Sequence, residues 1–124
     1  MPARIISEAD VEKPVVKYAR SKGVLVVKQT HAGARSHPDR AFYFTGGRLL
    51  QIEFKAPGKP PTILQAVTIE KLIELGFIVL IVDDALHGMN IINHYLAGHA
   101  VKLTDDNILS TIGLCSRVLD RKKQ

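Results

Sequence analysis

Residues 40–55 read RAFYFTGGRLLQIEFK, and this stretch sets the architecture of the chain. Two runs rich in aromatic and aliphatic residues flank Gly46-Gly47, and glycines adopt the positive φ angles that a tight hairpin turn requires. The pattern predicts two antiparallel strands, at 40–44 and 49–55. Because side chains alternate along a strand, Glu53 and Lys55 leave the sheet on one face and Phe54 points into the core.

The segment before this hairpin predicts a helix and a further strand. A helix over about 8–22 follows Ser7, has apolar residues at helical spacing and ends at Gly23. Pro14 predicts either a kink in this helix or a late start, because proline removes one backbone hydrogen bond and clashes with the preceding turn. Residues 24–28 are β-branched and apolar enough to form a strand.

The segment after the hairpin predicts a helix, a buried strand and two more helices. Thr62 caps the first helix, which ends at Gly76. The unbroken apolar run 77–82 is typical of a strand covered on both faces, which implies helices on either side of a mixed sheet. Helices over 89–96 and 107–119 follow. The predicted fold is therefore α/β, in the order α-β-β-β-α-β with C-terminal helices added.

Length and composition are those of one globular domain, with 124 residues, 46% of them hydrophobic and 23% charged. The longest apolar run is too short for a membrane-spanning helix, and no export signal is visible. The single cysteine, Cys115, excludes an internal disulfide and a cysteine-based zinc cluster. We therefore expect a protein with no membrane association, in the cytoplasm of a bacterial or phage-infected cell.

The basic charge is concentrated in the first third of the chain. The chain has 17 Lys and Arg against 12 Asp and Glu, a net charge of +5, and residues 1–40 contribute +4 of it. Basic surfaces attract phosphate backbones, although many small basic proteins bind no nucleic acid.

The hairpin predicts a cluster of charged side chains at one end of the sheet. Pairing through the glycine turn places the start of the first strand beside the end of the second, so Asp39 approaches Glu53 and Lys55. Two close carboxylates repel unless they share a proton or bind a cation, and hard oxygen ligands suit Mg²⁺ or Mn²⁺. A lysine beside the metal can hold an attacking water, which is the arrangement of metal-assisted phosphodiester hydrolysis. Each residue taken singly is also typical of an exposed strand face or a turn.

The run from Ser7 to Asp84 resembles the VRR-NUC family of the PD-(D/E)xK nuclease superfamily, in its small stand-alone phage and bacterial form. The matching segments, in chain order, are Glu8–Glu12, Gly33–Arg40, Gly46–Arg48, Ile52–Lys59, Leu64-Gln65 and Leu75–Phe77. The resemblance implies a restriction-endonuclease-like core over about 7–84 and a C-terminal helical extension over about 85–124, within a single domain, 1–124.

The resemblance also implies roles for individual residues. Asp39, Glu53 and the backbone carbonyl of Phe54 would bind Mg²⁺, for which Mn²⁺ can substitute. Lys55 would position the attacking water, and Gln65 matches the helix glutamine that supports the site.

The acid of the first helix and the phosphate contacts are less closely defined. Glu8 fits the family's helix acid better, but Glu12 lies one turn later on the same face, and Pro14 leaves the placement of both acids open. Three basic residues near the site in sequence are candidates for phosphate binding, and solvation explains each of them equally well: Arg35, Arg40 and Lys59.

The resemblance implies a Mg²⁺-dependent DNA endonuclease that selects branched DNA such as four-way (Holliday) junctions and acts as a homodimer. The alternatives are a non-cleaving DNA-binding module with a nuclease fold and an RNase of the same fold, because the sequence does not separate DNA from RNA. The predicted helix 107–119 carries an apolar stripe that suits either a two-fold interface or docking on its own core: Ile108, Leu109, Ile112 and Leu119.

Overall fold

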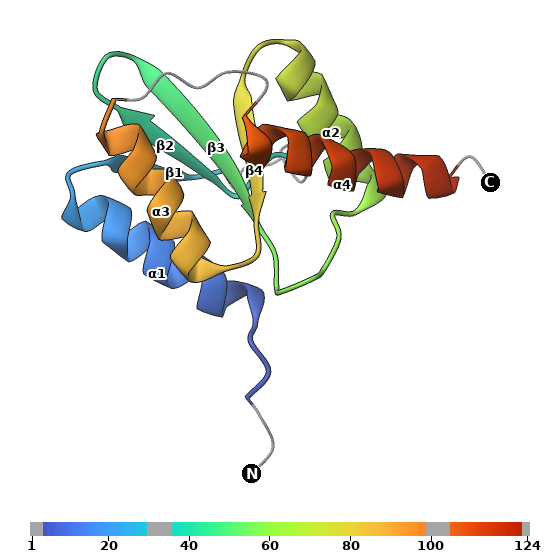
Figure 1. Ribbon diagram of the computed structural model, residues 1–124, viewed down its shortest axis with the longest axis horizontal. Helices are drawn as coiled ribbons and strands as arrows, with labels where there is room; N and C mark the ends of the chain where they lie inside the picture. Colours follow the sequence, from blue (N-terminus) through green and yellow to red (C-terminus); the bar gives the residue numbers. More distant parts are fainter. Residues whose placement is uncertain (1–3, 30–35, 99–104, 123–124) are drawn as a thin grey trace.

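The computed structural model describes residues 4–29, 36–98 and 105–122, which form a mixed sheet with helices on both faces (Figure 1). The elements are α1 (Glu8–Ser21), β1 (Leu25–Lys28), β2 (Arg40–Phe44), β3 (Arg48–Phe54), α2 (Ile63–Glu74), β4 (Ile78–Val82), α3 (Ala85–Leu96) and α4 (Asp106–Lys122). The sheet order is β1-β2-β3-β4, antiparallel except for the parallel pair β3 and β4. The predicted α/β fold and its element order are confirmed.

The central hairpin forms as predicted. Gly46 and Gly47 have φ angles of 83° and 74°, in the region that a side chain would strain. The β2–β3 register pairs Arg40 with Ile52. The start of β2 therefore lies beside the end of β3, where the charged cluster was expected.

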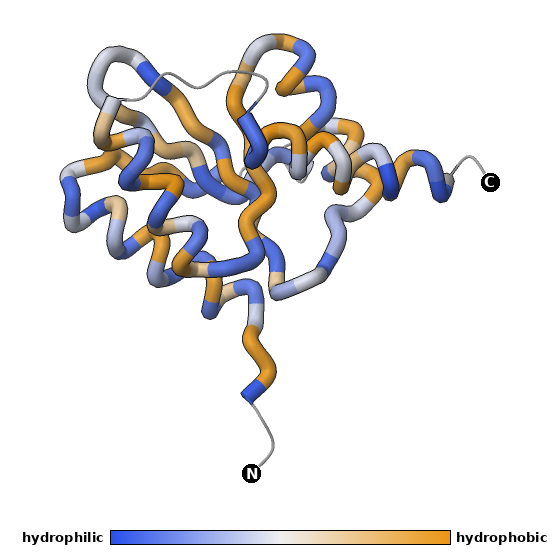
Figure 2. The backbone as a smooth tube through the Cα atoms, viewed as in Figure 1, coloured by the Kyte–Doolittle hydropathy of each residue, from blue (hydrophilic) through white to orange (hydrophobic). Residues whose placement is uncertain are grey.

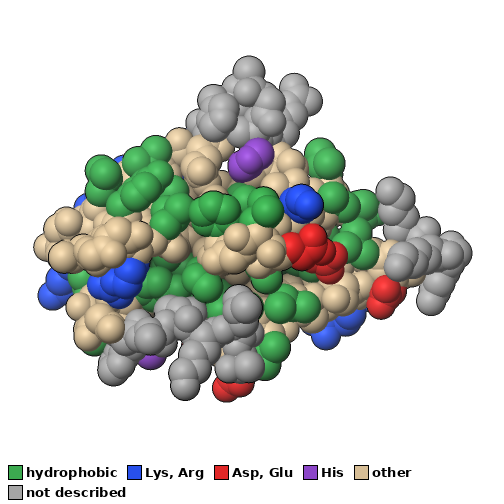
Figure 3. Space-filling model, turned by 90° about the horizontal axis from the view of Figure 1, so that it is seen from above, with side chains coloured by type: hydrophobic (Ala, Val, Ile, Leu, Met, Phe, Trp, Pro, Cys, Tyr) green, Lys and Arg blue, Asp and Glu red, His purple; other side chains and the backbone are tan. Residues whose placement is uncertain are grey.

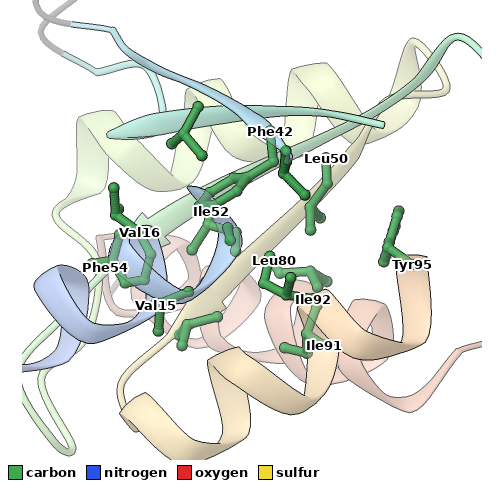
Figure 4. Packing of buried hydrophobic residues seen from close by; sticks show 14 of the residues in the cluster. Val15, Val16, Phe42, Leu50, Ile52, Phe54, Leu80, Ile91, Ile92 and Tyr95 are labelled. Carbon is green, nitrogen blue, oxygen red and sulfur yellow. The ribbon is translucent and has the colours of Figure 1, made fainter. Parts of the chain in front are cut away.

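Two apolar cores lie on opposite faces of the sheet. The core under α1 and α3 contains the large buried side chains of β2 and β3, among them Phe42, Leu50, Ile52 and Phe54 (Figure 4). The core under α2 and α4 is smaller and is built on Ala66, Ile69, Val79 and Cys115. Figure 2 shows β4 as a continuous apolar segment between the two helix layers. The prediction that this strand is covered on both faces is confirmed.

The first helix begins early and passes through its proline. Ser7 Oγ accepts from the Asp10 amide at 3.2 Å, and Asp10 Oδ2 accepts from the Ser7 amide at 2.8 Å. This reciprocal cap starts the helix at Glu8, so the late start that Pro14 allowed is excluded. The position of the helix acids is therefore set by the cap.

A close contact holds α1 against α3. Gly88 of α3 faces α1, and a Cβ at this position would lie 2.6 Å from Val15 Cγ2. Only a glycine lets the two helices approach so closely. This packing fixes the helix that carries Glu8.

The stripe on α4 docks on the chain's own core. Ile108 is buried in the first core, and Leu119 packs against the second. The buried Thr111 hydroxyl accepts from the Ile81 amide at 3.0 Å, which ties α4 to β4. Only Leu109 of the stripe points outward, with 51% of its surface exposed. The stripe as a whole is therefore not a dimer interface.

One smaller difference from prediction has a local cause. The third helix begins at Ala85, four residues before the expected start, because Asp84 caps it by accepting from the His87 amide at 2.8 Å. Among the described residues, no helix is long and apolar enough to cross a membrane.

Candidate active site

The predicted charged residues meet at the end of the β2–β3 hairpin. Asp39 directly precedes β2, and its Oδ2 accepts a hydrogen bond from the Phe54 amide at 2.9 Å. Glu53 lies near the end of β3, and the Lys55 amide continues the β3–β4 pairing by donating to the Val82 carbonyl at 3.0 Å. The backbone of two strands thus holds both carboxylates and the lysine together.

Glu53 is a buried acid with one oxygen left without a partner. Its side chain is 1% exposed, and Oε1 accepts from Gln65 Nε2 at 3.1 Å. Oε2 is buried and receives no hydrogen bond from an N–H or hydroxyl group of the described residues, although the carboxyl groups of Glu53 and Asp39 lie close enough to share a proton. Burial, followed by the negative charge of Asp39, raises the pKa of Glu53 to about 8. Without a cation, this group is therefore mostly protonated at neutral pH.

The donor set fits a divalent cation. Burial also raises the pKa of Asp39, and the charges of Glu12 on Asp39 and of Glu8 on Glu53 act in the same direction, so both carboxyl groups resist carrying negative charge although Lys55 is nearby. A cation would satisfy the free oxygen of Glu53 and replace its proton. Within the described ranges, no three His, Cys, Asp or Glu side chains could hold a metal among themselves. Two carboxylates with a carbonyl and waters would instead match the sparse protein ligation of Mg²⁺.

Burial excludes the interpretation of Glu53 and Lys55 as an exposed strand face. Lys55 is 4% exposed, and its positive charge opposes the raised pKa values of Glu53, Asp39 and Glu8. An ammonium group is rarely buried unless acids surround it. The lysine therefore belongs to the acidic cluster.

The two acids of α1 have different surroundings. The pKa of Glu8 is raised by partial burial and next by the charge of Asp39, which places Glu8 at the cluster. Glu12 accepts from Arg40 Nε at 2.9 Å in an ion pair that is largely shielded from solvent. The charge of Glu12 also acts on Asp39, so both helix acids lie within electrostatic reach of the site, and of the two Glu12 is the one held in an ion pair.

The three candidates for phosphate binding also differ in what the structure shows of their surroundings. Arg40 is engaged by Glu12. Lys59 is exposed on the loop after β3. It lies close enough to Glu8 for its positive charge to offset part of the rise in the pKa of that acid. Arg35 lies outside the described residues. Of the two candidates that the structure describes, Lys59 is thus the one left exposed beside the site.

The structure adds two positioning residues, Gln29 and Gln51. Gln29 Nε2 donates to the Pro38 carbonyl at 2.9 Å and to Gln51 Oε1 at 3.1 Å, and the Gln29 amide donates to the Asp39 carbonyl at 2.9 Å. These bonds hold the segment that carries Asp39. The sequence contained an indication of Gln51, because it is a polar residue two positions before Glu53 and therefore on the same face of the predicted strand. Nothing in the sequence pointed to Gln29.

Comparison with known proteins finds nucleases. The chain is 35% identical over 81 residues to "Putative nuclease p44" of Acyrthosiphon pisum secondary endosymbiont phage 1, a match that covers 65% of this chain and 87% of that protein. A solved structure described as a VRR_NUC domain aligns with a TM-score of 0.64 and 25% identity, covering 71% of this chain and 96% of the other. No family model matches the chain.

Proposed function

Because the chain belongs to the VRR-NUC family of nucleases, with its restriction-endonuclease-like α/β fold, we propose that it is a metal-dependent endonuclease that hydrolyses phosphodiester bonds in DNA. The observation that carries the metal dependence is Glu53 Oε2, a buried carboxyl oxygen beside Asp39 that no N–H or hydroxyl group of the described residues reaches. The raised pKa of the same group supports it, because a bound cation would make ionisation of Glu53 favourable.

The metal would be held by Asp39, Glu53 and the carbonyl of Phe54, as Mg²⁺ or in its place Mn²⁺. When bound, it would stabilise negative charge on the phosphate and acidify a bound water. Gln65 keeps Glu53 oriented, because its Nε2 donates to Glu53 while its own Oε1 accepts from the Thr62 amide at 2.9 Å. One glutamine side chain thus caps α2 and fixes a ligand of the site.

Lys55 and Glu8 would act on the attacking water. The Lys55 ammonium is almost fully removed from solvent, so its donors serve the site and can hold the water in line with the phosphate. Glu8 lies close enough to Asp39 for their charges to interact, and its raised pKa would make it a better proton acceptor than a glutamate with an ordinary pKa. Together they would place the nucleophile and remove its proton.

The finer part of the proposal is a preference for branched DNA and a homodimeric enzyme that cuts two strands. Both follow from the family resemblance. The α4 stripe does not supply the dimer interface, because it is packed within the chain. A two-fold pair of sites would match the symmetry of a four-way junction.

A cleavage assay tests the proposal. Purified protein is incubated with labelled four-way junction, linear duplex, single-stranded DNA and RNA, each with Mg²⁺, Mn²⁺ or EDTA. We expect metal-dependent cutting of DNA with the junction preferred, and its loss in Lys55→Ala. Lys71→Ala, which changes an exposed lysine on α2, is the matched control. Full activity in EDTA would contradict the metal dependence, and faster cutting of RNA would assign the RNase alternative.

A further inference from the structure

Three basic residues lie along one exposed face of α1. Lys13, Lys17 and Arg20 follow one another at spacings of four and three residues, which align side chains on one side of a helix. All three are exposed, whereas Val11 and Val15 on the opposite side are buried. The helix therefore presents a row of positive charge to solvent on the outside of the fold, across the sheet from α2 and α4 (Figure 1).

Lys28 at the end of β1 extends this row. It lies two residues beyond Val26, which is buried in the core beneath α1, so Lys28 points to the α1 side of the sheet. The register pairs it with Arg40, whose guanidinium binds Glu12 of α1. Lys28 is exposed and lies at the same end of the sheet as Asp39. We call Lys13, Lys17, Arg20 and Lys28 the basic face.

No carboxylate neutralises the basic face within the described residues. The four acids of residues 1–40 are engaged elsewhere: Glu8 and Asp39 at the site, Asp10 with Arg4 at 2.6 Å, and Glu12 with Arg40 at 2.9 Å. The net charge of this segment is +4, which leaves +1 for the other 84 residues. The excess positive charge of the protein is therefore concentrated in the segment of the chain that carries the basic face.

Other parts of the surface differ in character. In the view of Figure 3, hydrophobic and uncharged side chains predominate, and on the right half of this view acidic groups lie beside Lys and Arg. A row of uncompensated cations attracts a polyanion, and its affinity then depends steeply on salt. Charge complementarity thus points to a phosphate backbone as the occupant of the basic face.

The distances along α1 relate this face to the site. At a rise of 1.5 Å per residue, Lys13 and Lys17 lie about 8 and 14 Å along the helix axis from Glu8. Duplex DNA advances about 3.4 Å per base pair, so on a duplex arm that runs along α1 these lysines would fall about two to four base pairs from the site. We propose that the basic face binds the phosphates of a duplex DNA arm within about five base pairs of the cleaved bond. This rests on the proposed nuclease function and adds where the substrate lies.

The test compares two triple variants that lose the same charge. Lys13→Ala/Lys17→Ala/Lys28→Ala removes three members of the basic face. The control removes three exposed charges from α2 and α4, by substituting alanine at Lys71, Arg117 and Arg121. The Kd for a labelled four-way junction and a linear duplex is measured by fluorescence anisotropy in EDTA across a series of NaCl concentrations. Thermal unfolding with and without Mg²⁺ checks that both variants keep the fold and the metal site.

We expect the basic-face variant to bind both DNAs about 100-fold more weakly at 0.1 M NaCl, with the slope of log Kd against log salt reduced by about 3. The control should change much less. Equal weakening of both variants would attribute the effect to net charge and overturn the inference, as would wild-type affinity in the basic-face variant. Either result leaves cleavage by the wild type untouched, whereas a wild type that neither binds nor cuts DNA contradicts the proposed function itself.

A modified substrate tests the position of the contact. Neutral methylphosphonates placed two to four nucleotides from the cleaved bond should weaken binding of the wild type. The same modification should have little further effect on the basic-face variant, because the lysines that contact these phosphates are already absent. If the modification weakens both proteins by the same factor, the basic face does not lie at this position.

Discussion

Replacing Glu53 with glutamine should stabilise the metal-free protein at neutral pH, although it removes a residue of the proposed metal site. Glutamine has nearly the same shape, and its carbonyl can still accept the hydrogen bond from Gln65 Nε2. The change removes an ionisable group that is buried against Asp39. The gain arises because the wild-type carboxyl must take up a proton to fold at neutral pH, whereas the glutamine amide needs none.

The size of the effect follows from the pKa of Glu53, which rises from 4.5 to about 8 on folding. Between these values the folded protein binds more protons than the unfolded chain, so this group destabilises the fold increasingly as the pH rises. The contribution is most favourable below pH 4.5 and worsens until about pH 8. At pH 7 the loss is about 3 kcal/mol at 1.36 kcal/mol per pH unit. For a domain of this length, that corresponds to about 10 °C in Tm.

Thermal unfolding of the wild type and Glu53→Gln in EDTA, between pH 5 and pH 7.5, measures this difference. We expect similar Tm values at pH 5 and a higher Tm for the variant at pH 7.5. Mg²⁺ should then raise the Tm of the wild type and leave that of the variant unchanged. Only the wild type keeps both carboxylates that would bind the cation. Glu74→Gln, an exposed acid on α2, should behave as wild type. Parallel pH profiles for the wild type and Glu53→Gln would show that the buried acid does not control stability.

Four further outcomes follow from the site and the packing. Lys55→Ala should lower turnover at saturating Mg²⁺ by about 100-fold or more and change the metal affinity little, and Lys55→Arg should not restore turnover. Wild-type turnover in Lys55→Ala would remove Lys55 from the mechanism. Glu8→Gln should impair cleavage more than Glu12→Gln, and the reverse order would assign the helix acid to Glu12. Gln29→Ala should raise the Mg²⁺ concentration needed for half-maximal cleavage by about 10-fold, and Gln29→Glu should not restore it, since a carboxylate cannot donate to the Pro38 carbonyl. Ile112→Asp should destabilise the fold by about 3 kcal/mol because the charge would enter the first core. If thermal unfolding instead gives an unchanged Tm and the variant sediments as a monomer, Ile112 lies at a subunit contact.

The architecture was predictable because its signals are local. The Gly46-Gly47 turn sets the register of β2 and β3, and that register alone brings Asp39 opposite the end of β3. The apolar run of β4 indicated a strand with helices on both sides, and the Ser7 cap marked the start of α1. Each of these features depends on residues that are close in sequence, so the chain specifies them before it packs.

The chemical state of the site depends on contacts between distant segments. Glu53 loses its water and gains Gln65 only when α2 closes over the sheet, and its raised pKa follows from that burial. The pairing of Glu12 with Arg40 joins two residues 28 positions apart, and it forms only when α1 packs against the sheet. The α4 stripe could face a partner or its own core, and the packing of α4 against β4 and α2 settles which. Desolvation and packing are properties of the assembled layers, so no spacing along the chain could reveal them.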